Sequence, residues 1–307
     1  MVRRGLVLGC GGTVGGAWQV GALAALAAAL DWDPRTADTI LGTSAGGTAA
    51  AMLGSGVAVD EMVAAQLNST EARPSLRRFF GDPPAPLPAL PFGLPSPRTT
   101  LAGLRRGAVH LAAAGFALPG RTDAGFLNEL IDDLLPFGGW AGHPSVGIVA
   151  TDADSGQRVA FGRPGAPTVP LRDAVRASWA IPGWYPPVTL AGRRYLDGGA
   201  VSTASADLLA GDRLDEVIIV APMASSDGAR VPGPAGIAEL LLRAPMSWAL
   251  RREVRTLAEA GTPVRLVCPG RAELDAMGAN FMDPRRRLPA LHAALRHVPA
   301  QLKRSRS

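Results

Sequence analysis

The first sixty residues alternate between short apolar runs and glycine-rich breaks. "GLVLG" (5–9) has the length of a buried strand, and "CGGTVGG" (10–16) indicates a glycine loop. Residues 17–30 are apolar on most faces, as in a helix buried inside a domain. A second strand then runs into "LGTSAG" (41–46), and "SAGGTAAAMLGSG" (44–56) opens a second helix. This order of strand, loop, helix, strand, sharp turn and helix predicts an α/β fold.

Two hairpins and a helix are predicted in the middle of the chain. "PSVGIVATDADSG" (144–156) reads as a strand that ends in an acidic turn, with "QRVAFG" as its hairpin partner. "LRDAVRASWAIPGWYPPV" (171–188) predicts a helix that stops at Pro182, because the proline ring blocks continuation. "TLAGRRYLDGGA" (189–200) predicts a second hairpin, whose last strand carries Asp197 into a glycine turn.

The last third of the chain continues the α/β pattern. "DEVIIVAP" (215–222) and "PVRLVCPG" (263–270) predict buried strands, separated by a helix around 235–260. From residue 283 the sequence becomes a basic tail that we expect to fray at its end. No internal repeat and no clean domain boundary is visible.

One segment breaks the pattern. "GDPPAPLPALPFGLPSPR" (81–98) is too rich in proline for a helix interior or a central strand. Residues 101–120 follow with apolar positions at helical spacing. A surface excursion followed by a packed helix is the preferred interpretation, and a lid or a membrane-facing element is the alternative.

Composition agrees with a packed globular chain. Of the 307 residues, 47% are hydrophobic and 19% are charged. The net charge is +5, but no basic stripe is interleaved with aromatic residues, so we expect no nucleic-acid partner. The two cysteines, Cys10 and Cys268, give neither a metal-ligand spacing nor a disulfide framework, which favours a reducing, cytoplasmic location.

The N-terminal sequence is read as a strand and not as a signal. Only a few apolar residues follow Arg3 and Arg4, fewer than the roughly 7–15 of a secretory signal. No segment approaches about 20 uninterrupted apolar residues, so no membrane-spanning helix is expected.

"GTSAG" places Ser44 at a strand-to-helix turn. In a G-x-S-x-G turn the serine oxygen projects from a sharp elbow, and Gly42 and Gly46 let the two backbones pass closely. The unpaired N–H groups at the start of the helix favour negative charge on the serine oxygen. A small residue in a tight turn is the structural alternative, but the predicted strand before and helix after Ser44 favour a nucleophile.

A serine nucleophile needs a base, and histidine is the usual one. The late residues His292 and His297 have the chain order of an α/β-hydrolase, but they lie in an arginine-rich helix that reads as a solvated face. His143 reads as a loop residue. The remaining candidate is Asp197 in "YLDGG", although Asp-Gly is also a common hairpin turn. A carboxylate within hydrogen-bond reach of the serine can accept its proton as the attack proceeds.

The glycine loop offers backbone N–H groups to an oxyanion or to a phosphate. It is no Walker A motif, because no G-K-[ST] follows. The dinucleotide fingerprint also fits poorly, although Asp31 and Asp33 fall about 20 residues further on.

The glycine loop, "GTSAG" and "DGG", in this order, resemble the bacterial patatin-like phospholipases. The resemblance runs from about residue 5 to 210 and includes "ATDADSGQRVAF" and "LRDAVRASWAIPGWYPPVTLAGRRYLDGG". It implies a three-layer α/β/α fold with a mainly parallel sheet, and a Ser–Asp dyad without catalytic histidine, metal or cofactor.

Residue by residue, the resemblance makes Ser44 the nucleophile and Asp197 the base. Gly11 and Gly12 would line the oxyanion hole, and the motif glycines are Gly42, Gly46, Gly198 and Gly199. One departure is that the loop lacks the basic residue that the family usually has near its end, and that Cys10 stands where glycine is common. We expect a catalytic core over 5–210, strands and helices over 211–282 that complete the same domain, and the basic tail over 283–307.

The leading functional hypothesis is a serine acyl hydrolase that releases fatty acid from lipid esters through an acyl-enzyme. Its partners would be a lipid ester and, peripherally, an anionic membrane. A lipid-binding or regulatory protein with little turnover is the alternative, and a dinucleotide-dependent enzyme is a third interpretation. The sequence carries no inference on oligomeric state.

Overall fold

The computed structural model describes residues 2–81, 96–117, 120–225 and 234–304, and side chains are not described for residues 234–242 and 304. Within these residues the strands form one sheet. They are β1 (Arg4–Leu8), β2 (Thr39–Thr43), β3 (Val146–Asp152), β4 (Arg158–Phe161), β5 (Val188–Leu190), β6 (Arg193–Asp197), β7 (Glu216–Val220) and β8 (Val264–Val267).

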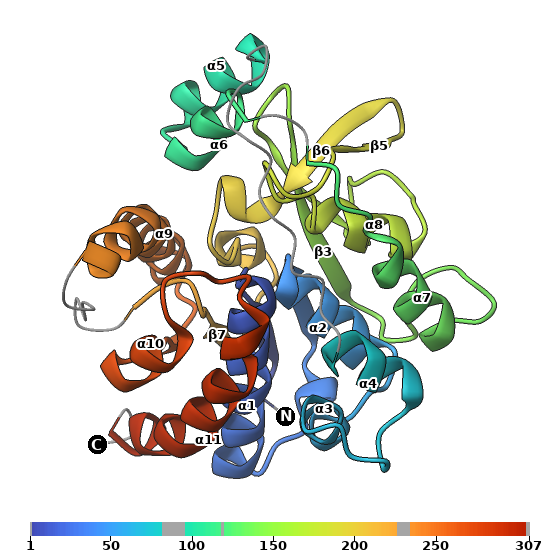
Figure 1. Cartoon of the computed structure of the whole chain (residues 1–307), viewed down its shortest axis with the longest axis vertical. Coiled ribbons are helices and arrows are strands. Elements are labelled where there is room, and N and C mark those ends of the chain that lie inside the picture. Colours follow the sequence, from blue (N-terminus) through green and yellow to red (C-terminus); the bar gives the residue numbers. More distant parts are fainter. Residues whose placement is uncertain (1, 82–95, 118–119, 226–233, 305–307) are drawn as a thin grey trace.

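Helices cover both faces of this sheet. They are α1 (Gly12–Leu30), α2 (Ala45–Gly54), α3 (Val59–Gln66), α4 (Pro74–Gly81), α5 (Pro97–Arg106), α6 (Val109–Ala114), α7 (Gly125–Leu134), α8 (Leu171–Ser178), α9 (Pro234–Glu259), α10 (Arg271–Met277) and α11 (Arg287–Arg304). Short 3₁₀ turns occupy Pro34–Thr36, Gly198–Ala200, Ala206–Leu209 and Pro284–Arg286. Figure 1 shows α1 and α11 at one end of the molecule and α5 and α6 at the other.

The sheet is parallel at its centre and antiparallel at one side. Its order is β5-β6-β3-β2-β1-β7-β8, with β4 paired to β3. The pairs β3–β2, β2–β1, β1–β7 and β7–β8 are parallel, and those among β3, β4, β5 and β6 are antiparallel. The expected mainly parallel sheet and both predicted hairpins are therefore confirmed.

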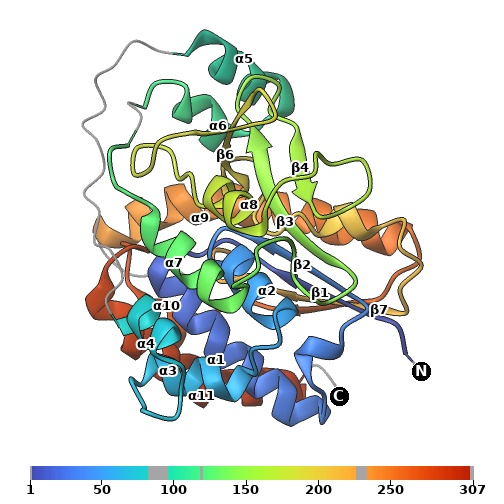
Figure 2. The same cartoon turned by 90° about the vertical axis from the view of Figure 1, so that its right-hand side faces the viewer.

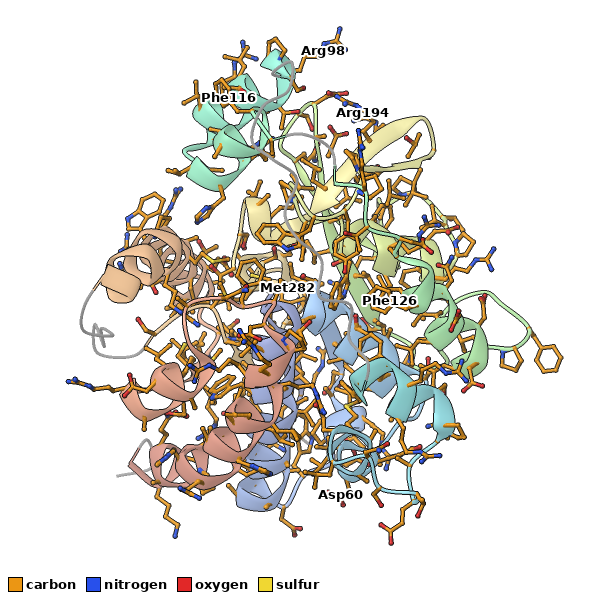
Figure 3. All side chains as sticks on the ribbon, viewed as in Figure 1. Asp60, Arg98, Phe116, Phe126, Arg194 and Met282 are labelled. Atoms are coloured by element: carbon orange, nitrogen blue, oxygen red, sulfur yellow. The ribbon has the colours of Figure 1, made fainter. Side chains whose placement is uncertain are left out.

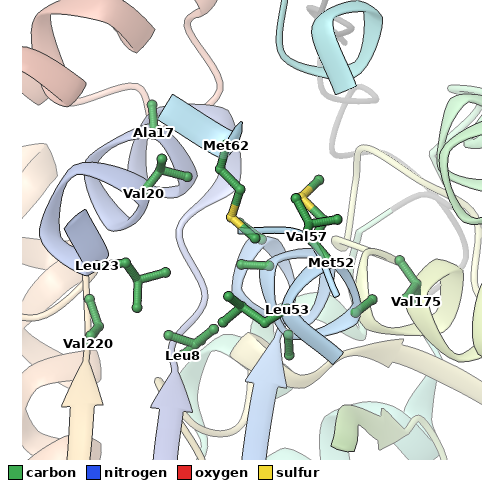
Figure 4. Packing of buried hydrophobic residues seen from close by; sticks show 14 of the residues in the cluster. Leu8, Ala17, Val20, Leu23, Met52, Leu53, Val57, Met62, Val175 and Val220 are labelled. Carbon is green, nitrogen blue, oxygen red and sulfur yellow. The ribbon is translucent and has the colours of Figure 1, made fainter. Parts of the chain in front are cut away.

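Successive side chains of the central strands point to opposite faces of the sheet and pack into two separate hydrophobic cores. Leu6 and Leu8 of β1 pack on one face with α1 and α2, whereas Val7 packs on the opposite face with Leu250 and Leu257 of α9. Figure 4 shows Leu8 and Val220 from the strands meeting Leu23 of α1 and Leu53 of α2. Figure 2 shows α9 on one side of the sheet and α1 and α11 on the other. This arrangement confirms the three-layer α/β/α fold.

Helix α1 is a core helix. Its 19 residues are long and apolar enough to cross a membrane, and it is the one such helix within the described part of the chain. Most of them are buried, however, and α1 packs against α11 and the sheet. The structure also corrects the glycine loop predicted over 10–16, because the helix already begins at Gly12. Glycine lowers helix propensity, but here the close approach of Pro222 to Gly11 and Gly15 favours residues without side chains.

Helix α8 also differs from its prediction. It ends at Ser178, four residues before Pro182. Proline has no N–H to donate to the carbonyl four residues earlier, which is that of Ser178, and its ring clashes there. The last residue of α8 is therefore Ser178, the residue whose carbonyl Pro182 can neither bond nor accommodate.

The C-terminal segment is not a free extension. Residues 287–304 form α11, in which Ala290, Leu291, Ala294, Val298 and Leu302 are buried. Only residues 305–307 of the expected fraying end lie outside the described residues. The division of the chain at 210 and 282 stays a prediction.

Candidate active site

Ser44 sits in the sharp turn between β2 and α2. Its backbone is left-handed, with φ 57° and ψ −123°, and the residue is 2% exposed. A Cβ on Gly42 would overlap the carbonyl oxygen of Gly46, and a Cβ on Gly46 would overlap that of Leu8. Strand and helix therefore pass too closely for any side chain at these two positions, as predicted from the motif.

Ser178 holds this turn in place. The Ser44 N–H donates to Ser178 Oγ at 2.7 Å, and the Ser178 hydroxyl donates to the Val149 carbonyl at 2.6 Å. Ser178 is fully buried. The strained turn is thus tied to the neighbouring strand β3 through one hydroxyl. No local motif indicates this role of Ser178, because it depends on α8 ending beside α2.

The register of β3 brings Asp197 to Ser44. Thr43, the last residue of β2, lies opposite Val149, and Asp197, the last residue of β6, lies opposite Ala150. Since β4 occupies the other edge of β3, β6 continues along the same edge as β2. Gly198 accordingly packs on the end of β2, where an added Cβ would lie 2.8 Å from Thr43 Cγ2. Two motifs 153 residues apart in sequence thus meet through adjacent positions of one strand.

The Asp197 carboxyl group is held in an environment suited to a base. It is 4% exposed and accepts the Gly199 N–H at 2.7 Å. Burial raises its pKa to about 7, although hydrogen bonds from the Ser44 hydroxyl and the Gly199 N–H act to lower the pKa. The hydroxyl and the carboxyl group line the same pocket, and no imidazole is among the causes that shift this pKa.

The glycine loop closes the site on the other side. Gly11 and Gly12 line the same pocket as Ser44 and Asp197. Nearby N–H groups are already used: that of Val14 donates to the Phe281 carbonyl at 3.0 Å and that of Gly15 to the Gly11 carbonyl at 2.9 Å. Among the residues that the structure describes, the N–H groups of Gly11 and Gly12 have no acceptor. They remain available to a ligand, as an oxyanion hole requires.

Arg243 of α9 supports the loop that lacks its own basic residue. This arginine is buried and donates to the Pro222 carbonyl at 2.6 Å. Pro222 in turn packs on the loop, since a Cβ on Gly11 would lie 2.8 Å from its Cγ. A cation distant in sequence therefore holds the element against which the loop rests, and no local pattern could have revealed it.

Cys10 is a wall of the pocket and not a second nucleophile. Its side chain lies against the "DGG" turn, 3.0 Å from where a Cβ on Gly199 would be. Burial, followed by the nearby Asp197 carboxylate, raises the pKa of the Cys10 thiol well above its usual value. The thiol stays protonated, and the protonated form is a poor nucleophile. Cys10 and Cys268 are both free.

The pocket lined by Ser44 and Asp197 is apolar and has a volume of about 310 Å³. Its walls come from α6, from the loop after α8 and from the C-terminal third of the chain, and include Ile181, Trp184, Met223, Met246 and Phe281. Such a cavity suits a hydrocarbon chain better than a polar substrate. Part of the 101–120 segment thus covers the site: α6 contributes His110, Ala113 and Ala114.

With one exception, the histidines do not line the pocket that contains Ser44. His292 and His297 both lie on α11, where His292 is exposed and His297 is half-buried. Neither lines the pocket. His143 has a structural role, since its Nε2 bonds to the Ala37 carbonyl at 2.7 Å. His110 does line the pocket, which the sequence did not indicate. Within the described parts of the chain, no cluster of three or more His, Cys, Asp or Glu residues could hold a metal ion.

Comparisons with known proteins identify the family of the chain. The chain is similar to the solved structure of VipD from Legionella pneumophila, with 15% sequence identity and a TM-score of 0.48, over 99% of this chain and 67% of that one. No curated protein matched in a sequence comparison. The family model described as patatin-like phospholipase matches residues 6–210, a span that contains the glycine loop, the Ser44 elbow and the Asp197 turn. The chain therefore belongs to the patatin-like phospholipase family.

Proposed function

We propose that this protein is a serine lipid acyl hydrolase that works through Ser44 and Asp197. Family membership supports lipid acyl hydrolase activity in general. The observation that carries the finer proposal is that Ser44 and the buried Asp197 carboxyl, whose pKa lies near 7, meet in one pocket at adjacent positions along β3. A general base with a pKa near the working pH is deprotonated in a large share of the molecules. It also binds a proton strongly enough to drive the transfer from the serine hydroxyl.

The first half of the reaction forms an acyl-enzyme. Ser44 Oγ attacks the ester carbonyl carbon while its proton moves to the Asp197 carboxylate. The negative charge that develops on the carbonyl oxygen is stabilised by the N–H groups of Gly11 and Gly12. The ester C–O bond then breaks, and the protonated Asp197 gives its proton to the departing alcohol oxygen.

The second half releases the fatty acid. Asp197, again a carboxylate, takes a proton from water as the water oxygen attacks the acyl carbon bound to Ser44. Collapse of the second tetrahedral intermediate breaks the bond to Ser44 Oγ, which recovers its proton from Asp197. The apolar pocket of about 310 Å³ holds the acyl chain beside the reacting carbon during both halves.

The test is a lipid panel scored by fatty acid released. We expect Ser44→Ala and Asp197→Asn each to lower kcat/KM by about a thousandfold or more, with the fold unchanged by circular dichroism. Asp275→Asn serves as the matched control, because Asp275 is exposed on α10 and does not line the pocket. Wild-type rates in the Ser44 variant would end the proposal. Tight lipid binding without turnover by the wild type would favour the lipid-binding or regulatory alternative instead.

We also propose that the face formed by α5, α6 and Phe116 contacts membranes. Four apolar side chains on it are between 46% and 66% exposed: Leu101, Leu104, Val109 and Phe116. Figure 3 shows Arg98 and Phe116 at the far end of this element, away from the body of the molecule. Exposed apolar groups beside arginines favour an anionic lipid surface. Of the segments behind this proposal, the proline-rich residues 82–95 lie outside the described residues.

A cytoplasmic location likewise stays a proposal, and it rests on the two free cysteines.

A further inference from the structure

The segment 198–206, directly after Asp197, contains buried hydroxyl groups. Ser202 is 4% exposed and Thr203 is 1% exposed. A buried hydroxyl group needs a hydrogen-bond partner inside the protein, because burial removes its bonds to water. For both residues this partner lies on α9, which is outside the span that the family model matches.

The hydrogen bonds of Ser202 leave its hydroxyl hydrogen for one acceptor. Its oxygen accepts the Ser205 N–H at 2.9 Å and the Nη1 group of Arg158 at 3.2 Å. Both lone pairs are thus occupied, and the hydroxyl donates to one oxygen of the Glu253 carboxyl group. The other Glu253 oxygen accepts the Ala206 N–H at 2.9 Å. One side chain of α9 therefore holds the segment at two points.

Thr203 joins α9 to the glycine loop. Its hydroxyl donates to the Met246 carbonyl of α9 at 2.6 Å, and its own carbonyl accepts the Cys10 N–H at 2.9 Å. The loop lies close to this carbonyl, since a Cβ on Gly9 would be 3.0 Å from the Thr203 oxygen. Cys10 directly precedes the two glycines of the proposed oxyanion hole. The start of the loop is therefore held in place through Thr203.

The same segment also contacts the turns of the nucleophile and of the base. The hydroxyl of Thr43, the residue before Ser44, donates to the Ala204 carbonyl at 3.4 Å. At the start of the segment, the Gly199 N–H donates to the carboxyl group of the base at 2.7 Å. The segment thus reaches all three parts of the candidate active site, and it is itself bound to α9.

A carboxyl group is a costly way to hold α9 on this segment. Glu253 is buried, burial raises its pKa, and its two donors, a hydroxyl and a backbone N–H, are neutral groups. Apolar contacts would join the two elements at a lower cost, but they are not directional. Hydrogen bonds fix both a distance and an angle. The network is therefore suited to setting geometry.

We propose that Glu253, acting through Ser202, is a positioning residue that sets the place of the Asp197 carboxyl group relative to the oxyanion loop. The inference rests on the proposed hydrolase function and adds to it a residue from the C-terminal third of the chain. Glu253 does not line the catalytic pocket, so it acts without touching the substrate. A displacement of about 1 Å among reacting groups can lower a rate about a hundredfold.

The experiment measures kcat and KM on a soluble ester, and the rate constant and final extent of labelling by a fluorophosphonate. Glu253→Gln keeps the shape of the side chain but turns an NH₂ group toward one of its two donors. Glu259→Gln is the matched control, because Glu259 is exposed on the same helix and lines neither the catalytic pocket nor the space beside Ser202.

We expect Glu253→Gln to lower both kcat and the labelling rate constant by about 10- to 100-fold, with KM within about threefold of the wild type. One probe per chain should still be bound at completion, and Glu259→Gln should match the wild type. A variant that is only destabilised loses active sites, so its final extent of labelling falls while the remaining sites react at the wild-type rate. That result would reduce Glu253 to a folding role and overturn the inference.

Ser202→Ala tests the route by which Glu253 acts. If the two side chains work through one bond, the variant with both changes should lose no more than about threefold beyond the worse single variant. Losses in kcat that multiply would contradict this route.

The failure of the inference and the failure of the hydrolase proposal give different results. Wild-type turnover together with unchanged kcat and labelling rate in Glu253→Gln overturns the inference alone. A wild type that neither hydrolyses esters nor takes up the probe ends both.

Discussion

The Asp197 carboxyl group combines three features that no single sequence motif encodes. It is buried, it accepts a backbone N–H from its own turn, and it shares its pocket with Ser44, whose hydroxyl acts to lower its pKa. Burial disfavours the charged form and both hydrogen bonds favour it. The balance leaves a pKa of about 7, well above that of an ordinary carboxylic acid and close to that of a histidine.

This balance predicts how activity depends on pH. The working form of the base is the carboxylate, which disappears below its pKa, so kcat/KM should rise by about tenfold per pH unit up to about pH 7 and stay level above it. The measurement is kcat/KM on an ester without titrating groups, from about pH 5 to about pH 9. A rate that falls with rising pH over this range would assign the proton transfer to another group.

A second prediction at this scale concerns Ser178. Ser178→Ala removes the acceptor of the Ser44 N–H and leaves that N–H and the Val149 carbonyl unpaired in the core. We expect a loss of about 1–3 kcal/mol in the free energy of unfolding. Because the turn is misplaced and the pocket is not, kcat should fall about tenfold or more while KM changes little.

Ser178→Cys keeps a weaker hydrogen-bonding group and should give intermediate values of kcat. Stability lost without any change in kcat would show that Ser178 acts only in folding.

Sequence reasoning at the residue scale succeeded where a motif is local. Ser44 with Gly42 and Gly46 forms one turn, so its spacing alone predicted the close backbone approach that the structure has. Ser178, Arg243 and His110 were missed because each acts across the fold, from a helix end, a distant helix and a covering helix. Nothing in their neighbours along the chain distinguishes them from ordinary structural residues.

At the scale of elements, α5, α6 and the residues just after α6 expose large apolar side chains. Leu104 and Phe116 are 66% and 56% exposed, and α6 also walls the catalytic pocket. An element that lies over the active site and exposes apolar side chains can deliver an acyl chain from a membrane to the pocket. The interpretation of residues 101–120 as a packed helix therefore holds for the side that lines the pocket and not for the exposed apolar side.

Leu104→Asp combined with Phe116→Asp should weaken binding to anionic vesicles by about tenfold or more, because each change removes an apolar side chain that would enter the lipid. The assay is co-sedimentation with vesicles of phosphatidylglycerol and phosphatidylcholine at low salt. Phe137→Asp is the control, since Phe137 is fully exposed but lies in the loop after α7. Vesicle binding that is unchanged in the double variant would place the membrane contact elsewhere.

Element boundaries show where sequence patterns were sufficient. The hairpins and the strands were predicted because period-two and continuous apolar patterns are local. The expected burial was wrong for β8, which lies at the edge of the sheet and buries only Val267 fully. The glycine-rich start of α1 was predicted as a loop, since glycine disfavours helix and the packing of Pro222 on Gly11 and Gly15 is a tertiary contact. The end of α8 was placed near Pro182, and the physical reason was right although the boundary was four residues too late.

At the scale of the molecule, the matched segment is not a complete sheet. The family model ends at residue 210, before β7 and β8, yet β7 pairs with β1 along its whole length. On the helical side, α11 packs against α1 more extensively than any other helix pair in the described structure. The basic composition of the segment concealed this role, because its buried apolar residues, among them Leu291, Ala294 and Val298, stand among charged and polar ones.

Removing residues 287–307 should therefore unfold the protein. The deletion exposes Leu291, Val298 and Leu302 together with the face of α1 that they cover. At about 1.5–3 kcal/mol for each large side chain, the loss reaches the whole stability of a typical domain, about 5–15 kcal/mol. Thermal melting by circular dichroism is the measurement, with a deletion of residues 305–307 as the control. A cooperative transition near the wild-type temperature in the longer deletion would contradict this view of α11.

The central claim is that one hydroxyl, activated by one buried carboxylate, performs the chemistry. The most direct measurement is covalent labelling with a fluorophosphonate, which bonds to an activated serine oxygen with loss of fluoride, followed by intact mass and peptide mapping. The account predicts one addition to the wild type, located at Ser44, none to Ser44→Ala, and much slower labelling of Asp197→Asn. Labelling of another residue, or equal labelling rates in the wild type and Asp197→Asn, would contradict it.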